Sequence, residues 1–271
     1  MKTKTPAVPY VIWMALFVVV PLVLIVVYAF TNYDGRFTLE NFANMDVFLQ
    51  VCGNSLYLAA LATVVCLIIA YPFAYFLAQT GPATRKVAML FIMLPMWMNF
   101  LLRTYAWMSI LENHGFLNQL LALVGLGPLH IINTDAAVIL GMVYNFLPFM
   151  ILPIYNQLIR IDNNLINASN DLGANKVQTF LRVVFPLSFP GVMSGITMTF
   201  MPAVTTFVIS KLLGGGQNAL IGDLIEQQFK TAGDWGFGSA ISVIVMILML
   251  LAMSFVSRYE RQSYESGGVL N

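Results

Sequence analysis

The sequence predicts an all-α membrane protein with six transmembrane helices. Of its 271 residues, 59% are hydrophobic and 9% are charged, and six long apolar runs recur along the chain. A soluble domain carries about 25% charged residues, and a helix needs about 20 apolar residues to cross the hydrocarbon core of a bilayer. The predicted spans are Tyr10–Phe30, Ser55–Gln79, Val87–Leu111, Ala136–Leu158, Ser188–Ser210 and Phe237–Ser257.

The first run is predicted to be a retained span and not a signal peptide. Lys2 and Lys4 precede it, as basic residues precede a signal peptide. However, its apolar stretch is too long, and no small-x-small cleavage site follows it. Residues 1–271 are therefore expected to form a single transmembrane domain.

Lysines and arginines in the short loops give the predicted helices an orientation. Short cytoplasmic loops carry an excess of these residues, so the side that holds most of them is assigned to the cytoplasm. Both termini and the loop 159–187 are then cytoplasmic, and the external side has more acids than bases, which favours an approaching cation. The basic residues assigned to the cytoplasmic side are Lys2, Lys4, Arg85, Lys86, Arg160, Lys176, Arg182, Arg258 and Arg261.

The third predicted span is the most polar of the six. It contains Trp97, Asn99, Arg103 and Tyr105, whereas the other five spans carry no charge. An arginine at the bilayer centre costs about 2.5–3.5 kcal/mol on the translocon scale. Two interpretations stand: Arg103 snorkels to the outer interface, or it lies in a water-filled path or against an acid of a partner subunit.

Prolines and small residues mark the fourth and fifth spans. The fourth contains Tyr144 and Asn145 together with Pro148 and Pro153. Such prolines free backbone carbonyls, which a membrane tolerates only where protein or water satisfies them. The fifth opens with a small-x-x-x-small spacing at residues 191–195, which lets helices approach closely. This span belongs inside the bundle or at a subunit interface, or it faces lipid with its hydroxyls bonded to its own backbone.

A polar interruption separates the fourth and fifth spans and is predicted to form two short helices. Asp162 can cap the first helix, and Gly173 can take the left-handed turn that ends it. Asn175 and Gln178 read as a capping pair for the second helix, and the proline that follows is expected to stop or bend the chain. Two short helices that meet at a glycine make a compact knob suited to a groove on another protein.

This interruption resembles the EAA loop of ABC-importer permeases. The family pattern is Glu-Ala-Ala, then a glycine, then apolar-x-apolar-Pro. The matching positions are Asn167, Ala168, Ser169, Gly173 and Pro186. The resemblance implies that the loop docks on a cytoplasmic ATPase, where the family Glu pairs with a basic residue. Asn167 replaces that Glu, and a neutral hydrogen bond contributes about 0.5–1.5 kcal/mol against about 1.5–3 for a charged one. We therefore expect weaker docking, unless Asp171 supplies the missing charge.

The loop allows three other interpretations. A DNA-binding helix-turn-helix would need more basic residues than Arg160, Lys176 and Arg182. Residues 167–169 also spell a glycosylation acceptor, which matters only in an oxidising lumen. A purely structural cytoplasmic loop remains open.

Three further stretches resemble the B-type permease of spermidine/putrescine ABC importers: Leu94–Asn99 with Leu102–Tyr105, Asp171–Ala174 and Leu220–Asp223. This resemblance implies a type I importer permease fold in the bacterial cytoplasmic membrane. It also implies a second homologous permease, an ATPase dimer and an external polyamine-binding protein as partners. The chain has no phosphate-binding Gly-x-x-x-x-Gly-Lys-Ser/Thr loop, so ATP and Mg are expected on the ATPase, and no cofactor or enzymatic activity is predicted here.

A polyamine carries several positive charges and needs carboxylates or aromatic faces along its path. The predicted spans contain no acids, so cation–π contacts of about 0.5–2 kcal/mol each are assigned to aromatic side chains, and the carboxylates to the partner permease. The predicted path residues are Trp97, Asn99, Arg103, Tyr105, Tyr144 and Asn145.

Other functions remain as alternatives. An importer for another small solute, such as an inorganic anion, fits the same pattern and would use Arg103 as a ligand. A secondary transporter is expected to show buried acids for ion coupling, and a noncatalytic scaffold would show no transport. His114 and His130 share one predicted external loop and are too few for a metal site, so none is predicted.

Overall fold

The computed structural model describes residues 8–43, 45–216 and 219–267, with side chains as far as Ser254. Lys2, Lys4 and the side chains of Arg258 and Arg261 lie outside this description. The described chain is helical, with one isolated bridge between Thr31 and Phe37. In chain order the elements are α1 (Val8–Met14), η2 (Ala15–Val19), α2 (Val20–Ala29), η3 (Glu40–Phe42), α3 (Met45–Gln79), α4 (Pro82–Trp97), α5 (Phe100–Leu111), α6 (Phe116–Leu123), α7 (Asp135–Leu158), α8 (Asn163–Asp171), α9 (Lys176–Thr179), η4 (Phe180–Val184), α10 (Phe185–Thr205), α11 (Val208–Leu213), α12 (Ile221–Gln227), η5 (Gln228–Ala232) and α13 (Trp235–Gly267).

Five helical segments of the described chain are long and apolar enough to cross a membrane, and a bent pair makes a sixth if it counts as one span. The five segments overlap the first, second, fourth, fifth and sixth predicted runs, so the all-α fold is confirmed. Their bounds are Val8–Ala29, Met45–Gln79, Asp135–Leu158, Lys176–Thr205 and Trp235–Ser254.

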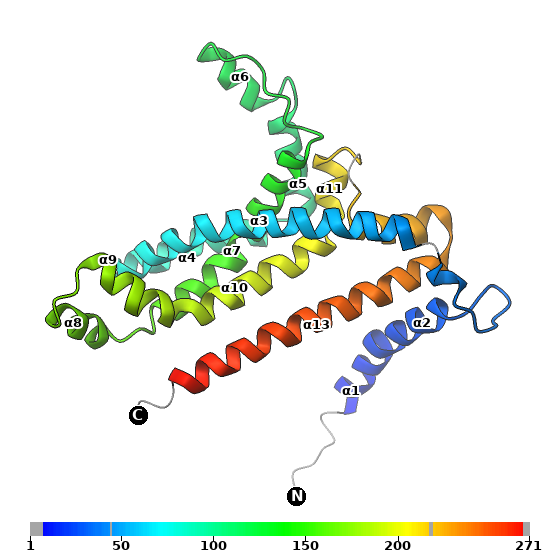
Figure 1. The fold of residues 1–271 in the computed structure, drawn as a ribbon. Helices are drawn as coiled ribbons and strands as arrows, with labels where there is room; N and C mark the ends of the chain where they lie inside the picture. The colour runs from blue at the N-terminus through cyan, green and yellow to red at the C-terminus, as the bar shows by residue number, and fades with distance from the viewer. Residues whose placement is uncertain (1–7, 44, 217–218, 268–271) are drawn as a thin grey trace, which may run out of the picture.

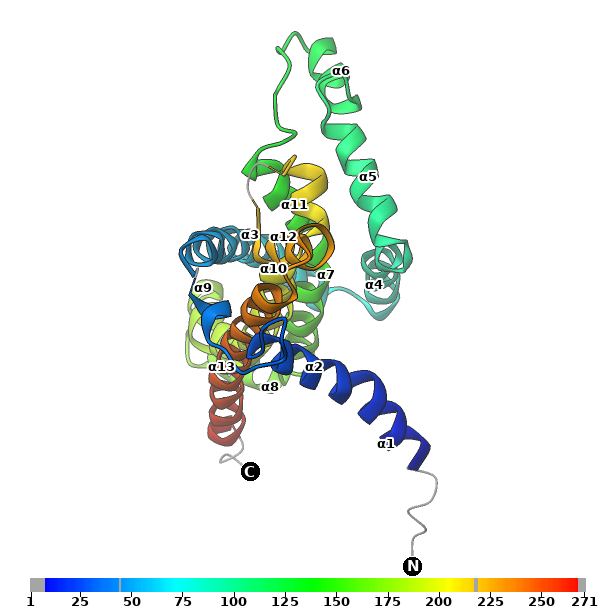
Figure 2. The same ribbon diagram turned by 90° about the vertical axis from the view of Figure 1, so that its right-hand side faces the viewer.

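The third predicted span, Val87–Leu111, is not one straight helix. The helical segments Pro82–Trp97 and Phe100–Leu123, which begin with α4 and α5, meet at an angle of 93°. Pro95 weakens the end of α4 because it lacks a backbone N–H and crowds the preceding turn. Asn99 then starts α5: its side-chain oxygen accepts hydrogen bonds from the backbone N–H of Leu101 at 2.8 Å and of Leu102 at 3.4 Å. As Figures 1 and 2 show, α6 projects away from the other helices, whereas α5 packs against α11 and α7.

The fifth predicted span, Ser188–Ser210, also differs from the prediction. Pro186 neither stops the chain nor bends it sharply, because Lys176–Thr205 runs on as one helical segment. A π-helical turn, η4, ends two residues before this proline, which stands in the first turn of α10, where a proline is best tolerated. The helix ends instead at Thr206, where an extended backbone with ψ of 143° separates α10 from α11.

Helices α3, α7 and α10 pack together as the centre of the bundle (Figure 1). The approach of α10 to α7 depends on two glycines, as the small-residue spacing predicts. A Cβ atom at Gly191 would lie 2.7 Å from Gln157 Cβ and 2.8 Å from the Pro153 carbonyl oxygen, and one at Gly195 would lie 2.8 Å from Met150 Sδ. This part of the fifth span therefore lies inside the bundle.

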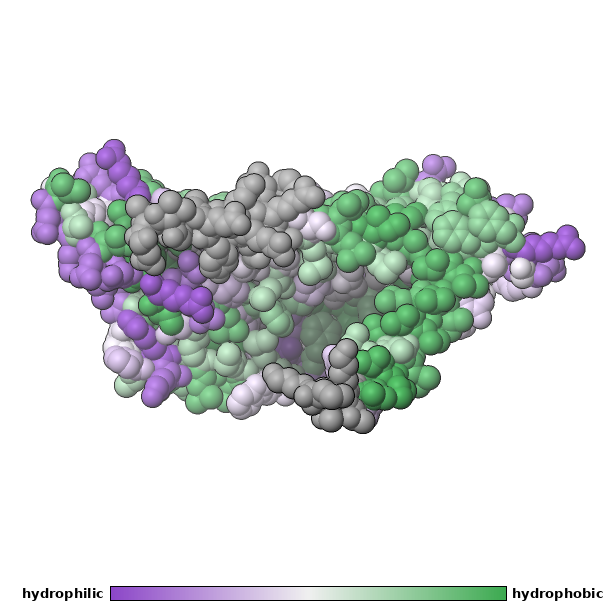
Figure 3. Space-filling model, turned by 90° about the horizontal axis from the view of Figure 1, so that it is seen from below, coloured by the Kyte–Doolittle hydropathy of each residue, from purple (hydrophilic) through white to green (hydrophobic). Residues whose placement is uncertain are grey.

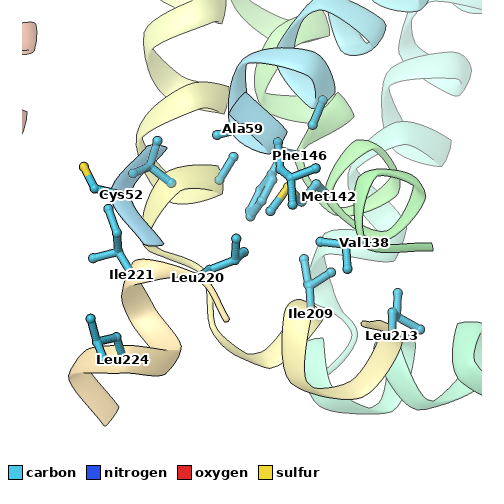
Figure 4. Packing of buried hydrophobic residues seen from close by; sticks show 14 of the residues in the cluster. Cys52, Ala59, Val138, Met142, Phe146, Ile209, Leu213, Leu220, Ile221 and Leu224 are labelled. Atoms are coloured by element: carbon cyan, nitrogen blue, oxygen red, sulfur yellow. The ribbon is translucent and has the colours of Figure 1, made fainter. Parts of the chain in front are cut away.

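A hydrophobic core closes the end of the bundle at which α11 and α12 meet α3 and α7. Figure 4 shows Ile209 and Leu213 of α11 facing Val138 and Met142 of α7, with Ile221 of α12 on the other side. All five side chains are buried. The chain that follows the break at Thr206 is thus part of the packed structure.

Apolar side chains cover much of the outer surface. The apolar window of Val8–Ala29 is not buried at all, and α2 lies beside α13 while α1 stands apart (Figures 1 and 2). In Figure 3, hydrophilic residues gather at the end that carries α8 and α9 and at the opposite tip, with a broad apolar zone between them. This pattern fits a bilayer that surrounds the middle of the bundle.

The glycine contact between α7 and α10 gives a stability prediction. Gly191→Ala forces a Cβ against the backbone of α7 and should cost about 1–3 kcal/mol through overpacking. Gly53→Ala on α3 is the matched control, because its Cβ would meet nothing within 4 Å. Thermal unfolding in detergent should show a midpoint lower by several degrees for the first variant and not for the second. Equal midpoints would contradict the close approach.

Candidate functional site

The turn at Gly173 folds the chain between α8 and α9 sharply back on itself. The carboxylate of Asp162 caps α8 by accepting the backbone N–H of Asn164 at 2.9 Å. At the other end Gly173 adopts a φ of 83°, its N–H donates to the Asn170 carbonyl, and the following N–H donates to the Ser169 carbonyl. This is a Schellman motif. The cap and the turn are both where the sequence predicts them.

The second helix is fixed to the first by side chains. Asn175 and Gln178 form the predicted capping box, with reciprocal side-chain to backbone hydrogen bonds of 2.9 Å each. Ser169 Oγ and Thr179 Oγ1 lie 3.0 Å apart and share a hydrogen bond between α8 and α9. The serine that replaces the second family alanine therefore joins the two helices. We refer to residues 162–184 as the elbow.

The outer face of the elbow carries uncovered apolar side chains. Leu172 is 89% exposed, and Leu165 and Val177 are also exposed. Of the predicted coupling residues, Ala168, Ser169, Gly173 and Pro186 line one groove of about 740 Å³, whereas Asn167 and Asp171 are exposed outside it.

Phe180 joins the elbow to the membrane helices. Its ring meets Tyr75 edge-on with centroids 5.1 Å apart and Tyr71 at 5.9 Å. The Tyr71 hydroxyl is 2.7 Å from Ser188 Oγ on α10. Sequence reasoning missed this contact. The available signal was the spacing of Tyr71 and Tyr75, which puts both rings on one face of α3.

Arg103 is buried, with 9% of its surface exposed. The carbon at the centre of its guanidinium lies 5.9 Å from the ring centroid of Phe100 and 6.0 Å from that of Tyr144. Its Nε has no hydrogen-bond partner, and no acidic side chain of the described residues pairs with it. The guanidinium thus lies against aromatic faces within the chain.

The other predicted path residues are brought together in part. Tyr144 contacts Trp107 with ring centroids 5.2 Å apart, as well as Arg103. Asn145 is buried beside it, donates to the Gly141 carbonyl at 2.8 Å, and leaves its own side-chain oxygen unpaired. Trp97 and Tyr105 are exposed, and neither stacks on another ring of the described chain. Asn99 serves as the cap of α5.

At the opposite end of the bundle, the stretch Leu220–Asp223 fixes α12 beside the break in the fifth span. The backbone N–H of Ile221 donates to Ser55 Oγ at 2.8 Å. A Cβ atom at Gly222 would lie 2.4 Å from the Thr205 carbonyl oxygen, so a larger residue does not fit. The residues of this stretch that resemble the family therefore have a structural role.

Asp223 completes this contact. Its carboxylate accepts hydrogen bonds from Ser210 Oγ and from the backbone N–H of Leu220. Burial raises the pKa of Asp223 above its usual range, although the two hydrogen bonds act in the opposite direction. Nearby Glu226 pairs with Lys230 at 2.9 Å and Lys211 at 3.4 Å. The hydrogen bond from Lys230 is the main cause that lowers the pKa of Glu226.

Comparison with known proteins places these features in a family. The family described as "Binding-protein-dependent transport system inner membrane component" matches residues 70–262. The spermidine/putrescine transport system permease protein PotB of Haemophilus influenzae is 39% identical over 249 residues, which is 88% of this chain and 87% of that protein. PotB of Escherichia coli K12 is 38% identical over 266 residues, or 93% of this chain and 97% of that protein.

The fold also matches a solved structure. A bacterial alginate ABC transporter, crystallised in complex with an alginate pentasaccharide-bound periplasmic protein, superposes with a TM-score of 0.80 at 15% sequence identity. The match covers 95% of this chain and 93% of the other.

The environment of Asp223 gives a pH prediction. A folded-state pKa above the unfolded value means that this carboxyl contributes its full stability below about pH 4 and loses it as the pH rises through the folded pKa. Asp223→Asn should therefore raise the thermal midpoint near neutral pH and flatten its fall with rising pH. Asp223→Ala should lower the midpoint, because the buried backbone N–H of Leu220 loses its acceptor at a cost of about 1–3 kcal/mol, while Ser210 Oγ can still donate to the Phe207 carbonyl.

Thermal unfolding of both variants between pH 4 and pH 8 is the measurement. A loss of stability for Asp223→Asn as large as that for Asp223→Ala would show that the charge itself holds α12 in place.

Proposed function

Since this chain belongs to the family of inner membrane components of binding-protein-dependent transport systems, we propose that it is the permease of an ATP-driven polyamine importer. It is a multi-pass inner membrane protein. In this proposal the chain forms the translocation path together with a second homologous permease. Spermidine and putrescine are the proposed cargo, because PotB relatives that carry these names are 38–39% identical over most of the chain.

The observation that carries the proposal is the elbow. It is a rigid pair of helices with a glycine turn, an internal hydrogen bond and an uncovered apolar face at one end of the membrane helices. An exposed apolar surface that is rimmed by polar residues marks an interaction site. We assign this surface to a cytoplasmic ATPase dimer, which holds the ATP and Mg, while this chain holds no cofactor. Both termini then lie in the cytoplasm.

Coupling in this proposal is mechanical. When the ATPase moves the elbow, Phe180 presses on Tyr71 and Tyr75 of α3, and the Tyr71 hydroxyl bonds to Ser188 of α10. Because α3 and α10 both pack on α7, a displacement of the elbow is passed to all three central helices. Such a rigid-body shift can open the path alternately to the two sides of the membrane.

The predicted spans offer aromatic faces and no carboxylates to a cationic cargo. Tyr144 is already engaged by Arg103 and Trp107, whereas Trp97 is 78% exposed and can present its ring to an amine. Cation–π contacts of about 0.5–2 kcal/mol are too weak to hold a polyamine alone. We therefore assign the carboxylates to the second permease, and the delivery of cargo to an external polyamine-binding protein.

Uptake of labelled spermidine tests the proposal. The chain is expressed with its partner components in cells that lack other polyamine uptake. Unlabelled putrescine should reduce uptake, and sulfate or molybdate should leave it unchanged. An importer for an inorganic anion, in which buried Arg103 would be a ligand, predicts no uptake of labelled spermidine.

Two matched variants test the elbow in the same assay. Gly173→Arg places a side chain at a φ of 83° in the elbow, and Gly125→Arg places one at a φ of 78° in the loop after α6; a Cβ at either glycine meets nothing within 4 Å. Uptake should be lost for the first variant and largely kept for the second. Normal uptake by Gly173→Arg, at an equal protein level in the membrane, would refute the coupling role.

A further inference from the structure

A pocket of about 510 Å³ lies behind the elbow, between α8 and α9 on one side and the ends of α3 and α7 on the other. It is separate from the groove on the outer face of the elbow, because the two share no lining residue. Its volume falls in the range of about 300–1,000 Å³ that is usual for pockets that bind small molecules. Neither the predicted coupling residues nor the predicted path residues line it.

The charges of the pocket are of one sign. Arg85, from the first turn of α4, and Lys176, from the first turn of α9, both line it, and its lining contains no aspartate or glutamate. The nearby acids Asp162 and Asp171 are exposed outside the lining. Carboxamides of Gln79, Asn163 and Asn170 add hydrogen-bond donors to the same wall.

Arg85 has donors to spare in this pocket. A guanidinium carries five N–H donors, and the hydrogen bond that the structure shows for this one runs from Nη2 to the carbonyl of Ala78 at the end of α3. Its Nε is buried without a partner. A buried donor on a charged group is costly when it is unpaired, and phosphate oxygens are acceptors that fit a guanidinium well.

The opposite wall is apolar, with Tyr75, Leu158, Ile166 and Val184 in the lining. The pocket also lies where α3 and α7 end, and so at the level where transmembrane helices meet lipid headgroups. Basic pockets between such helices bind the headgroups of acidic lipids. We propose that this pocket binds a phosphate group through Arg85 and Lys176, either from an acidic phospholipid headgroup or from a soluble phosphate compound.

A bound phosphate would bridge the start of α4 to the start of α9. The elbow would then be tied to the membrane helices at a second point, in addition to the contact of Phe180. This site would make the position of the elbow depend on the supply of the anion, a form of control that the proposed transport function does not itself require.

Binding to the full-length chain, purified with its assembled partners, tests the proposal. Native mass spectrometry counts bound phosphatidylglycerol against phosphatidylcholine, with and without millimolar inorganic phosphate as a competitor. If each lost contact raises the dissociation constant tenfold, Lys176→Gln should weaken phosphatidylglycerol binding about tenfold. The double variant Arg85→Gln with Lys176→Gln should then weaken it about a hundredfold. Lys86 lies next to Arg85 in the sequence but does not line the pocket, so the Lys86→Gln variant should bind phosphatidylglycerol normally.

The two sources give different results. Phosphatidylglycerol that inorganic phosphate does not displace identifies a lipid headgroup, and displacement by phosphate identifies a soluble compound. If the double variant does not fold, Lys176→Gln decides alone, because its side chain is exposed. The proposal would be overturned if the native chain and these variants bound phosphatidylglycerol equally well. It would also be overturned if the chain did not prefer phosphatidylglycerol to phosphatidylcholine and inorganic phosphate did not change lipid binding.

Discussion

The contact of the Phe180 ring with Tyr71 and Tyr75 joins the elbow to the membrane helices, and the organisation of this end of the molecule depends on it. Ile166 of α8 also packs against the hydrophobic core at this end of the bundle. With the Phe180 contact, the elbow, α3 and, through the bond between Tyr71 and Ser188, α10 share one packed joint. A rigid joint of this kind is what a lever needs if a force on an exposed surface is to move helices inside a membrane.

The same bundle contains two breaks, and each is stabilised by specific polar contacts. Asn99 caps α5 where the third span turns by 93°, and Leu220–Asp223 covers the break between α10 and α11 through bonds to Ser55 and Ser210. Irregular backbone at membrane depth is tolerated where protein satisfies its polar groups. These two sites show how the chain meets that requirement, and both lie away from the elbow.

Local signals predicted much of the elbow from the sequence. The cap at Asp162, the turn at Gly173 and the capping box of Asn175 and Gln178 involve only neighbouring residues. The local sequence is therefore enough to predict them. The bend at Asn99 could not be predicted in this way, because the length of an apolar run is the same for a straight helix and a broken one. The burial of Arg103 depends on Tyr144, forty-one positions further along the chain, and such a contact leaves no pattern in a single sequence.

The most direct test of the account is to ask what touches the elbow. A photo-crosslinking amino acid at Leu172, which is 89% exposed on the elbow, is compared with one at Tyr33, which is 94% exposed in the loop between α2 and α3. With a tagged ATPase of the same system expressed alongside, the account predicts a covalent adduct with the ATPase from position 172 and none from position 33. No adduct from position 172, or an ATPase adduct from position 33, would contradict the claim that the elbow is the surface on which the ATPase acts.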